Sequence, residues 1–168
     1  DIAGAVGIQA SGIYRFFAGK GDMLAASYRR AADRISGDLA NIVATESDPT
    51  QAMMRLIDAY VARSFRDPEI AYVYYTERAN LPETDRAILR NIQRSVIESW
   101  TRLLVAARPE LNSNQARFAV HASFALVVDL GRLVHYDDTP HSQACVRRMM
   151  EVTLFGPPPD VKKTAKVR

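Results

Sequence analysis

The residues best suited to chemistry lie in the first 24 positions, where two short helical patterns are joined by a turn. The spacing predicts helices over 1–6 and 12–17, a helix-turn-helix arrangement. Ile13, Phe16 and Phe17 share one face of the second helix and can anchor it to a core. The opposite arc holds amide, hydroxyl and guanidinium groups and no carboxylate. It consists of Gln9, Ala10, Ser11, Tyr14 and Arg15. These groups suit hydrogen bonds to phosphates and base edges of DNA.

Lys20 follows this pair at the start of the next expected helix. Its ammonium and the amides of that helix N-terminus can hold one phosphate together. The alternative is an amphipathic helical pair in an unrelated bundle, with Tyr14 and Lys20 as ordinary surface residues. The two interpretations differ in whether these side chains contact DNA.

The first 24 residues read Asp-Ile-Ala-x-x-x-Gly-Ile-x-x-x-x-Ile-Tyr-x-x-Phe-x-x-Lys-x-x-Met-Leu. This pattern resembles the DNA-binding signature of the tetracycline-repressor (TetR) family, with Gly7, Tyr14, Phe17, Lys20 and Leu24 at the family's spacing. The resemblance implies that Tyr14 and Lys20 contact backbone phosphates. It also implies that bases or adjacent phosphates are faced by Gln9, Ala10, Ser11 and Arg15.

The resemblance covers the family's second and third helices and the start of the fourth. The family's first helix, which packs across this motif, has no counterpart in the sequence, so we expect a further segment upstream. Phe16 stands where the family often has a phosphate-contacting histidine. Gly12 costs the recognition helix about 1 kcal/mol relative to alanine, so we expect greater dependence on Arg15.

The rest of the chain predicts an all-α fold: a helix-turn-helix head followed by a helical ligand-binding and dimerisation bundle. Helix starts are signalled by an N-cap residue followed by proline at Asp48-Pro49, Asp67-Pro68 and Thr139-Pro140. Further starts are expected at Leu81-Pro82-Glu83 and at Ser113, which can act as a cap. Residues 71–76 favour a strand by propensity, but without a second strand to pair with we expect a short helix.

Three segments follow from these signals. Residues 1–45 are the DNA-binding domain, incomplete at its N-terminus, with a connecting helix from about 21. Residues 46–156 form the ligand-binding and dimerisation domain, whose last helix is capped by Gly156 and stopped by Pro157. Residues 157–168 are a basic tail that we expect to be disordered.

Helices over about 114–136 and 140–154 are expected to form a homodimer. The first of them is apolar on most faces, with small residues that allow close approach, so it must be buried on most faces. Packed with the second helix through Cys145, Val146, Met149 and Val152, it would form a four-helix interface across a two-fold axis. The alternative is burial inside the monomer core.

A ligand pocket is expected among the aromatic and sulfur-containing side chains of the central helices. Aromatic rings with a polar tip suit ligand cavities, although the same stripes also form plain cores. Because few charges interrupt this set, we expect a small lipophilic or flat aromatic effector. The expected ligand-binding residues are Met53, Ile57, Tyr60, Tyr74, Trp100, Phe118 and His121.

The composition excludes several classes of protein. With 48% hydrophobic and 24% charged residues in 168, the chain is an ordinary globular protein rather than a disordered one. A single cysteine, Cys145, excludes an internal disulfide. The net charge of +3 permits an anionic partner without requiring one. No segment is apolar enough to span a membrane and no signal peptide is evident, so we expect a cytoplasmic protein.

An enzyme is the first rival interpretation. The segment His135-x-Asp137-Asp138-x-x-His141 has metal-capable side chains, but it falls in a turn where polar residues are expected. His121, Ser123 and Asp129 lie two and six positions apart on one helix, which cannot assemble a catalytic triad. We therefore expect no catalytic residues, metal or cofactor.

The sequence thus predicts a transcriptional regulator, most simply a repressor. It would bind a palindromic double-stranded DNA operator as a dimer and be released by a small hydrophobic effector. The second rival interpretation is a helical small-molecule-binding or scaffold protein without DNA-binding activity.

Overall fold

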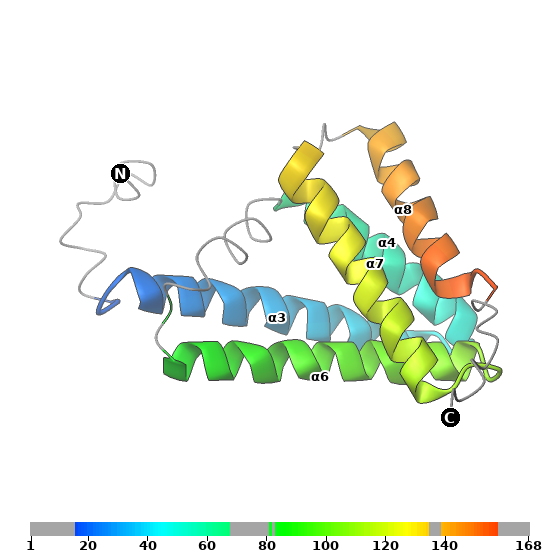
Figure 1. Cartoon of the computed structure of the whole chain (residues 1–168), viewed down its shortest axis with the longest axis horizontal. Helices are drawn as coiled ribbons and strands as arrows, with labels where there is room; N and C mark the ends of the chain where they lie inside the picture. Colours follow the sequence, from blue (N-terminus) through cyan, green and yellow to red (C-terminus); the bar gives the residue numbers. More distant parts are fainter. Residues whose placement is uncertain (1–15, 68–80, 82, 135–138, 158–168) are drawn as a thin grey trace, which may run out of the picture.

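The computed structural model describes residues 16–67, 81, 83–134 and 139–157 (Figure 1). Every regular element within these residues is a helix, which confirms the all-α prediction. The helices are α3 (Lys20–Thr45), α4 (Pro49–Arg66), α6 (Glu83–Ala107), α7 (Ser113–Val134) and α8 (Pro140–Phe155). The predicted short helix over 71–76 lies outside the described residues.

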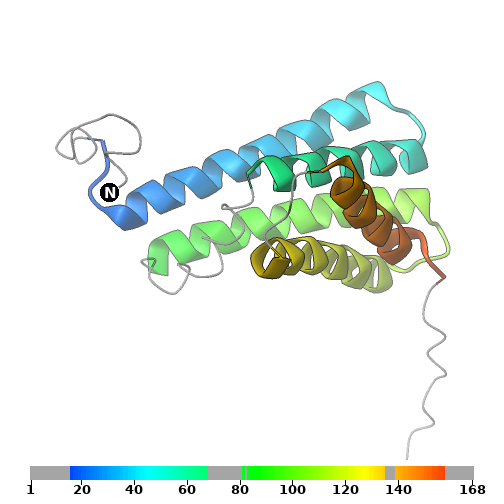
Figure 2. The same cartoon turned by 90° about the horizontal axis from the view of Figure 1, so that it is seen from above.

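The two longest helices, α3 and α6, lie side by side along the molecule (Figures 1 and 2). Helix α4 packs against both of them, and α7 packs on α6. Helix α8 contacts α4 and α7, so the three shorter helices gather over one end of the α3–α6 pair. None of the helices in the described part of the chain is long and apolar enough to cross a membrane.

Local capping explains where α4 and α8 begin. Asp48 accepts hydrogen bonds from the backbone nitrogens of Thr50 (2.7 Å) and Gln51 (2.9 Å), and Pro49 takes the first helical position. Thr139 accepts one from Ser142 N at 3.1 Å, ahead of Pro140. Both starts match the sequence prediction.

The start of α7 differs from the prediction that Ser113 caps it, because Ser113 is already the first helical residue. Asn112 is the cap: its Oδ1 accepts from the nitrogens of Asn114 and Gln115, each at 3.0 Å. Gln115 Oε1 accepts in return from Asn112 N at 3.0 Å. This reciprocal capping box satisfies backbone donors that a helix end otherwise leaves unpaired.

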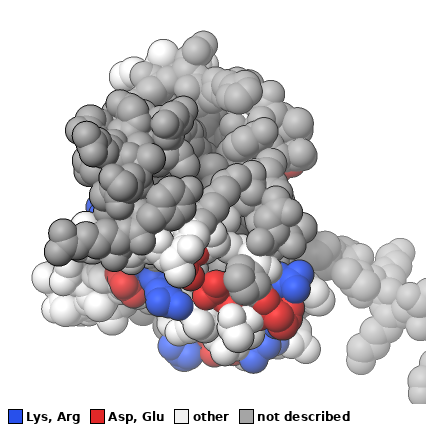
Figure 3. All heavy atoms as spheres, turned by 90° about the vertical axis from the view of Figure 1, so that its left-hand side faces the viewer, with Lys and Arg blue, Asp and Glu red and all other residues white. Residues whose placement is uncertain are grey.

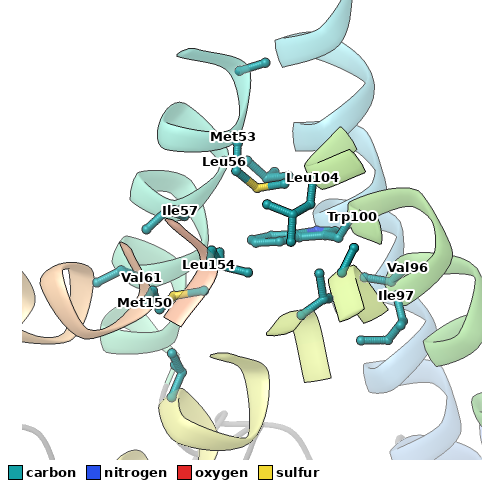
Figure 4. Close-up of a cluster of buried hydrophobic side chains, with 14 of the residues drawn as sticks. Met53, Leu56, Ile57, Val61, Val96, Ile97, Trp100, Leu104, Met150 and Leu154 are labelled. Atoms are coloured by element: carbon teal, nitrogen blue, oxygen red, sulfur yellow. The ribbon is translucent and has the colours of Figure 1, made fainter. Parts of the chain in front are cut away.

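The main core joins all five helices around Trp100, which is fully buried (Figure 4). A second, smaller cluster lies between the N-terminal halves of α3 and α6 and contains Leu24, Tyr28, Leu81 and Leu89. Apolar residues of α3 thus belong to two separate clusters, one at each half of the helix. The space between the two clusters is where the candidate site lies.

Candidate functional sites

Lys20 is the first residue of α3, at the helix N-terminus where the sequence places it. Asp22, in the same first turn, accepts a hydrogen bond from Ala18 N at 2.9 Å. The other expected DNA-contacting residues lie outside the described residues, namely Gln9, Ala10, Ser11, Tyr14 and Arg15. The structure therefore describes the helix that follows the expected reading head and not the head itself.

Figure 3 looks onto the end of the molecule where α3 and α6 begin. Acidic and basic side chains are mixed on the part of this face that the structure describes. Glu83 accepts from Arg90 at 2.7 Å and lies 2.9 Å from Arg86. Hydrogen bonding by Arg90, followed by the positive charge of Arg86, holds the pKa of Glu83 below its ordinary value.

A cavity of about 200 Å³ lies between α3, α4, α6 and α7. Its walls are mainly apolar and include Ala32, Ile35, Ile92, Val96 and Val128. Tyr60 and Phe124 contribute two parallel stacked rings, with centroids 4.6 Å apart. This mixture of apolar wall and aromatic face is typical of small-molecule sites.

The polar part of the cavity comes from the last turns of α4 and from α6. Arg63, Ser64 and Asp67 line it from α4 and its C-cap, and Gln93 lines it from α6. Ser64 Oγ donates to the carbonyl of Tyr60 at 2.9 Å, which leaves the two charged groups as the main polar features of the α4 side.

Two ion pairs connect these charges to α3. Arg63 pairs with Asp38, and Asp67 lies 3.9 Å from Arg34. On each helix the arginine comes one turn before the aspartate. The first residue of one helix pairs with the second of the other, so opposite charges face each other. The cavity wall therefore carries one positive and one negative group, and each is paired with an opposite charge on α3 that does not itself line the cavity.

Of the seven expected ligand-binding residues, Tyr60 is among the residues that line this cavity, and the others lie elsewhere or outside the described residues. Trp100 packs edge-on against Tyr60 and Phe124 at centroid distances of 5.5 and 4.7 Å. Met53 and Ile57 are fully buried in the main core and are not among the residues lining the cavity. Tyr74 lies outside the described residues.

Phe118 and His121 are both exposed on α7, away from this cavity. Phe118 is 74% exposed. His121 lies in a surface hollow between α6 and α7, beside Arg90, Arg94 and Arg117. Neither side chain is brought together with Tyr60. Arg63, Asp67 and Gln93 also line the cavity and were not predicted from the sequence. The one sequence feature that could have indicated the two charged residues is their spacing of one helical turn.

The outer face of α7 and α8 carries several exposed apolar side chains. Phe118, Met149 (45% exposed) and Val152 (55%) are exposed large hydrophobic residues on these helices. Small or weakly polar exposed side chains continue the face: Ala122, Ala125 and Cys145. Val146, expected at the same interface, instead packs into the monomer core at 4% exposure.

No group of three or more metal-capable side chains lies together within the described residues. His141 is described, and its Nε2 lies 3.7 Å from the thiol sulfur of Cys145. His135, Asp137 and Asp138 of the metal-capable segment lie outside the described residues.

This arrangement of helices is the fold of solved TetR-family transcriptional regulators. A regulator of that family from Bordetella parapertussis superposes with a TM-score of 0.76 at 19% identity, over 93% of this chain and 82% of that one. PfmR, a TetR-family transcriptional regulator from Thermus thermophilus, superposes with a TM-score of 0.76 at 17% identity, over 93% and 86%. A tetR-family regulatory protein from Rhodococcus superposes with a TM-score of 0.71 at 21% identity, over 92% of this chain and 83% of that one.

Other comparisons give no relatives. No protein-family model matches the sequence, and no curated protein matches it. At these levels of identity the structural likeness defines the fold, and function must be argued from the sites.

Proposed function

We propose that this chain is a ligand-responsive DNA-binding transcriptional regulator that acts in the cytoplasm. The observation that carries the proposal is the likeness to three transcriptional regulators over more than nine-tenths of the chain. The signature pattern at residues 1–24 supports it independently, because it falls where such proteins carry their helix-turn-helix. By this proposal Tyr14 and Lys20 contact phosphates, and Arg15 reads bases.

A homodimer through α7 and α8 is part of the proposal. Two-fold symmetry would present two reading heads to the two halves of a palindromic operator. The exposed apolar face formed by Phe118, Met149 and Val152 supports this interface, because monomeric proteins rarely leave such a face in water.

Repression relieved by a small effector completes the proposal. The cavity lies against α3, the helix that leads directly from the expected reading head, so a bound ligand can favour one position of α3 over another. A shift in that position changes the separation of the two heads and therefore the match to DNA.

The test is DNA binding by the full chain. An operator is selected from a random pool of double-stranded DNA, and binding is measured by gel retardation at several salt concentrations. Arg15→Ala should weaken binding and relax sequence preference. Lys20→Ala should weaken binding about equally on all sequences and reduce the salt slope by about 1.

Arg102→Ala is the matched control, because Arg102 is an exposed cation on α6, far along the helix from the end where α3 begins. Its affinity and salt slope should equal those of the wild type. Retention of wild-type binding by both Arg15→Ala and Lys20→Ala would overturn the proposal and favour a helical small-molecule-binding or scaffold protein without DNA-binding activity.

A further inference from the structure

The cavity presents an unusual pair of charges for a site with apolar walls. Arg63 and Asp67 lie one helical turn apart, and both line the cavity. Each already has an oppositely charged partner on α3, Asp38 for Arg63 and Arg34 for Asp67. Any ligand must therefore fit a wall that is polar at one end and neutral overall.

Charge balance restricts the ligand. The two ion pairs, Arg63 with Asp38 and Asp67 with Arg34, already balance each other's charges. A carboxylate or an ammonium placed in the cavity would therefore add a charge that has no partner. Burying an unpaired charge costs free energy, and this lowers the affinity for a charged ligand. The cavity therefore disfavours both anions and cations relative to neutral molecules of the same shape.

The same two residues retain hydrogen-bonding capacity. A guanidinium has five N–H donors, and within the described residues Asp38 is the only partner of Arg63's guanidinium. The Asp67 carboxylate can accept several hydrogen bonds, and its described side-chain partner is Arg34 at 3.9 Å. A ligand group beside them gains most if it accepts from Arg63 and also donates to Asp67.

The remainder of the wall fits a flat apolar body. Ile35, Ile92 and Val96 are among the apolar lining residues, and the stacked rings of Tyr60 and Phe124 offer an aromatic surface. Aromatic pairs favour stacked or edge-to-face contact with a further ring.

We propose that the cavity binds a neutral, flat, apolar molecule with one head group that both donates and accepts hydrogen bonds, such as a carboxamide, oriented toward Arg63 and Asp67. The proposed binding mode is argued from the cavity alone, whereas the role of the bound molecule as the effector rests on the proposed function. Lipophilic molecules that carry a charge, or that lack a donor–acceptor head group, are therefore expected to bind more weakly.

Three probes with one ring system test the head group: 2-naphthamide, 2-naphthoate and 2-methylnaphthalene. Their dissociation constants are measured by titration calorimetry with the full chain. We expect 2-naphthamide to bind at least about ten-fold more tightly than either of the others, a difference of about 1.4 kcal/mol. Binding of 2-naphthoate or 2-methylnaphthalene as tight as that of the amide, or no binding of the amide, would overturn the inference.

Asp67→Asn tests the charge argument directly, because it removes one negative charge and keeps the shape. We expect 2-naphthoate to bind this variant at least about five-fold more tightly than it binds the wild type. The matched control is Asp58→Asn on the same helix, since Asp58 pairs with Arg147 of α8 and does not line the cavity. An equal gain in both variants would mean that overall charge, not the cavity, sets the preference.

Ala32→Phe tests the location by filling the cavity from α3. This substitution should abolish binding of 2-naphthamide while the helicity, measured by circular dichroism, is retained. Val128→Phe fills the same cavity from α7 and serves as an independent second variant. Undiminished binding by both folded variants would refute the location. Operator binding without any ligand is measured in parallel, so a failure of the DNA-binding proposal and a failure of this inference give different results.

Discussion

Arg108 and Leu154 join the C-terminal ends of α6 and α8: Nη1 of Arg108 donates a 2.7 Å hydrogen bond to the carbonyl oxygen of Leu154. The same nitrogen donates to the carbonyl of Gly156 at 2.9 Å, and Nε donates to Glu110 at 2.8 Å. Carbonyls at the end of a helix have no partner within it, and a cation there also complements the helix dipole. Arg108 is buried, so it fixes α8 against the end of α6.

Arg108→Ala should lower the free energy of unfolding by about 2–3 kcal/mol, because the substitution leaves buried carbonyls unpaired. Urea unfolding followed by circular dichroism measures the change. Glu110→Ala removes only the exposed partner of the same arginine and should lower the stability much less, because water screens an exposed ion pair. Equal losses in the two variants would show that the carbonyl contacts contribute little.

The capping box of α7 gives a second prediction. Asn112→Ala removes the acceptor for two backbone N–H groups and should cost about 1 kcal/mol. Ser113→Ala, one residue along, should change the free energy of unfolding by less than half as much, because Ser113 is exposed and already within the helix. Thermal unfolding of the pair checks this, and a larger loss for Ser113→Ala would mean that the helix begins one residue later.

The ionisation of Glu83 gives a third prediction. Its pKa lies below the ordinary value of 4.5, chiefly because Arg90 donates a hydrogen bond to the ionised carboxylate. Since folding favours the ionised form, this contribution to stability is complete above the ordinary pKa. It is lost as the pH falls through the lower value of the folded chain.

Arg90→Gln should raise the pKa of Glu83 toward 4.5, as measured by an NMR titration of the side-chain carboxyl carbon. Arg94→Gln is the control, because it removes a neighbouring cation that does not contribute to the shift. A shift of the same size in both variants would assign the effect to general positive charge on α6 and not to the hydrogen bond.

Much of the fold could be predicted from the sequence because the signals are local. Asp48 and Thr139, each followed by proline, mark helix starts that the structure reproduces. The cap of α7 was displaced by one residue because Asn112 and Ser113 are both good caps. The hydrogen bonds distinguish between them: Asn112 Oδ1 accepts from two backbone nitrogens, and Gln115 Oε1 accepts in return from Asn112 N.

The cavity could be predicted only in part because its polar end depends on contacts distant in sequence. Arg63 and Asp67 look like ordinary exposed charges at the end of a helix until their ion pairs with α3 are seen. The sequence places Phe118 in the pocket because it is one of the aromatic side chains of the central helices, but it is exposed. Since α7 is apolar on most faces, periodicity cannot tell which apolar face meets the core. Tertiary packing makes that choice.

The apolar outer face of α7 and α8 gives the last prediction. Residues 118, 122 and 125 share one face of α7, and residues 145, 149 and 152 share one face of α8, by their spacing of three and four. Two copies related by a two-fold axis would cover both faces with each other, and the exposed side chains would then form the centre of a four-helix interface.

Val152→Glu should therefore convert the dimer to a monomer in sedimentation analysis at micromolar concentration, because the interface would have to strip the water from two new carboxylates. Val43→Glu makes the same change at a residue of similar exposure on α3, away from this face, and should leave the dimer intact. Because DNA affinity in the proposed function depends on two heads held together, Val152→Glu should also weaken operator binding at least about ten-fold while its helicity stays unchanged. A wild-type chain that sediments as a monomer would refute the dimer. A Val152→Glu variant that still sediments as a dimer would place the interface elsewhere in the molecule.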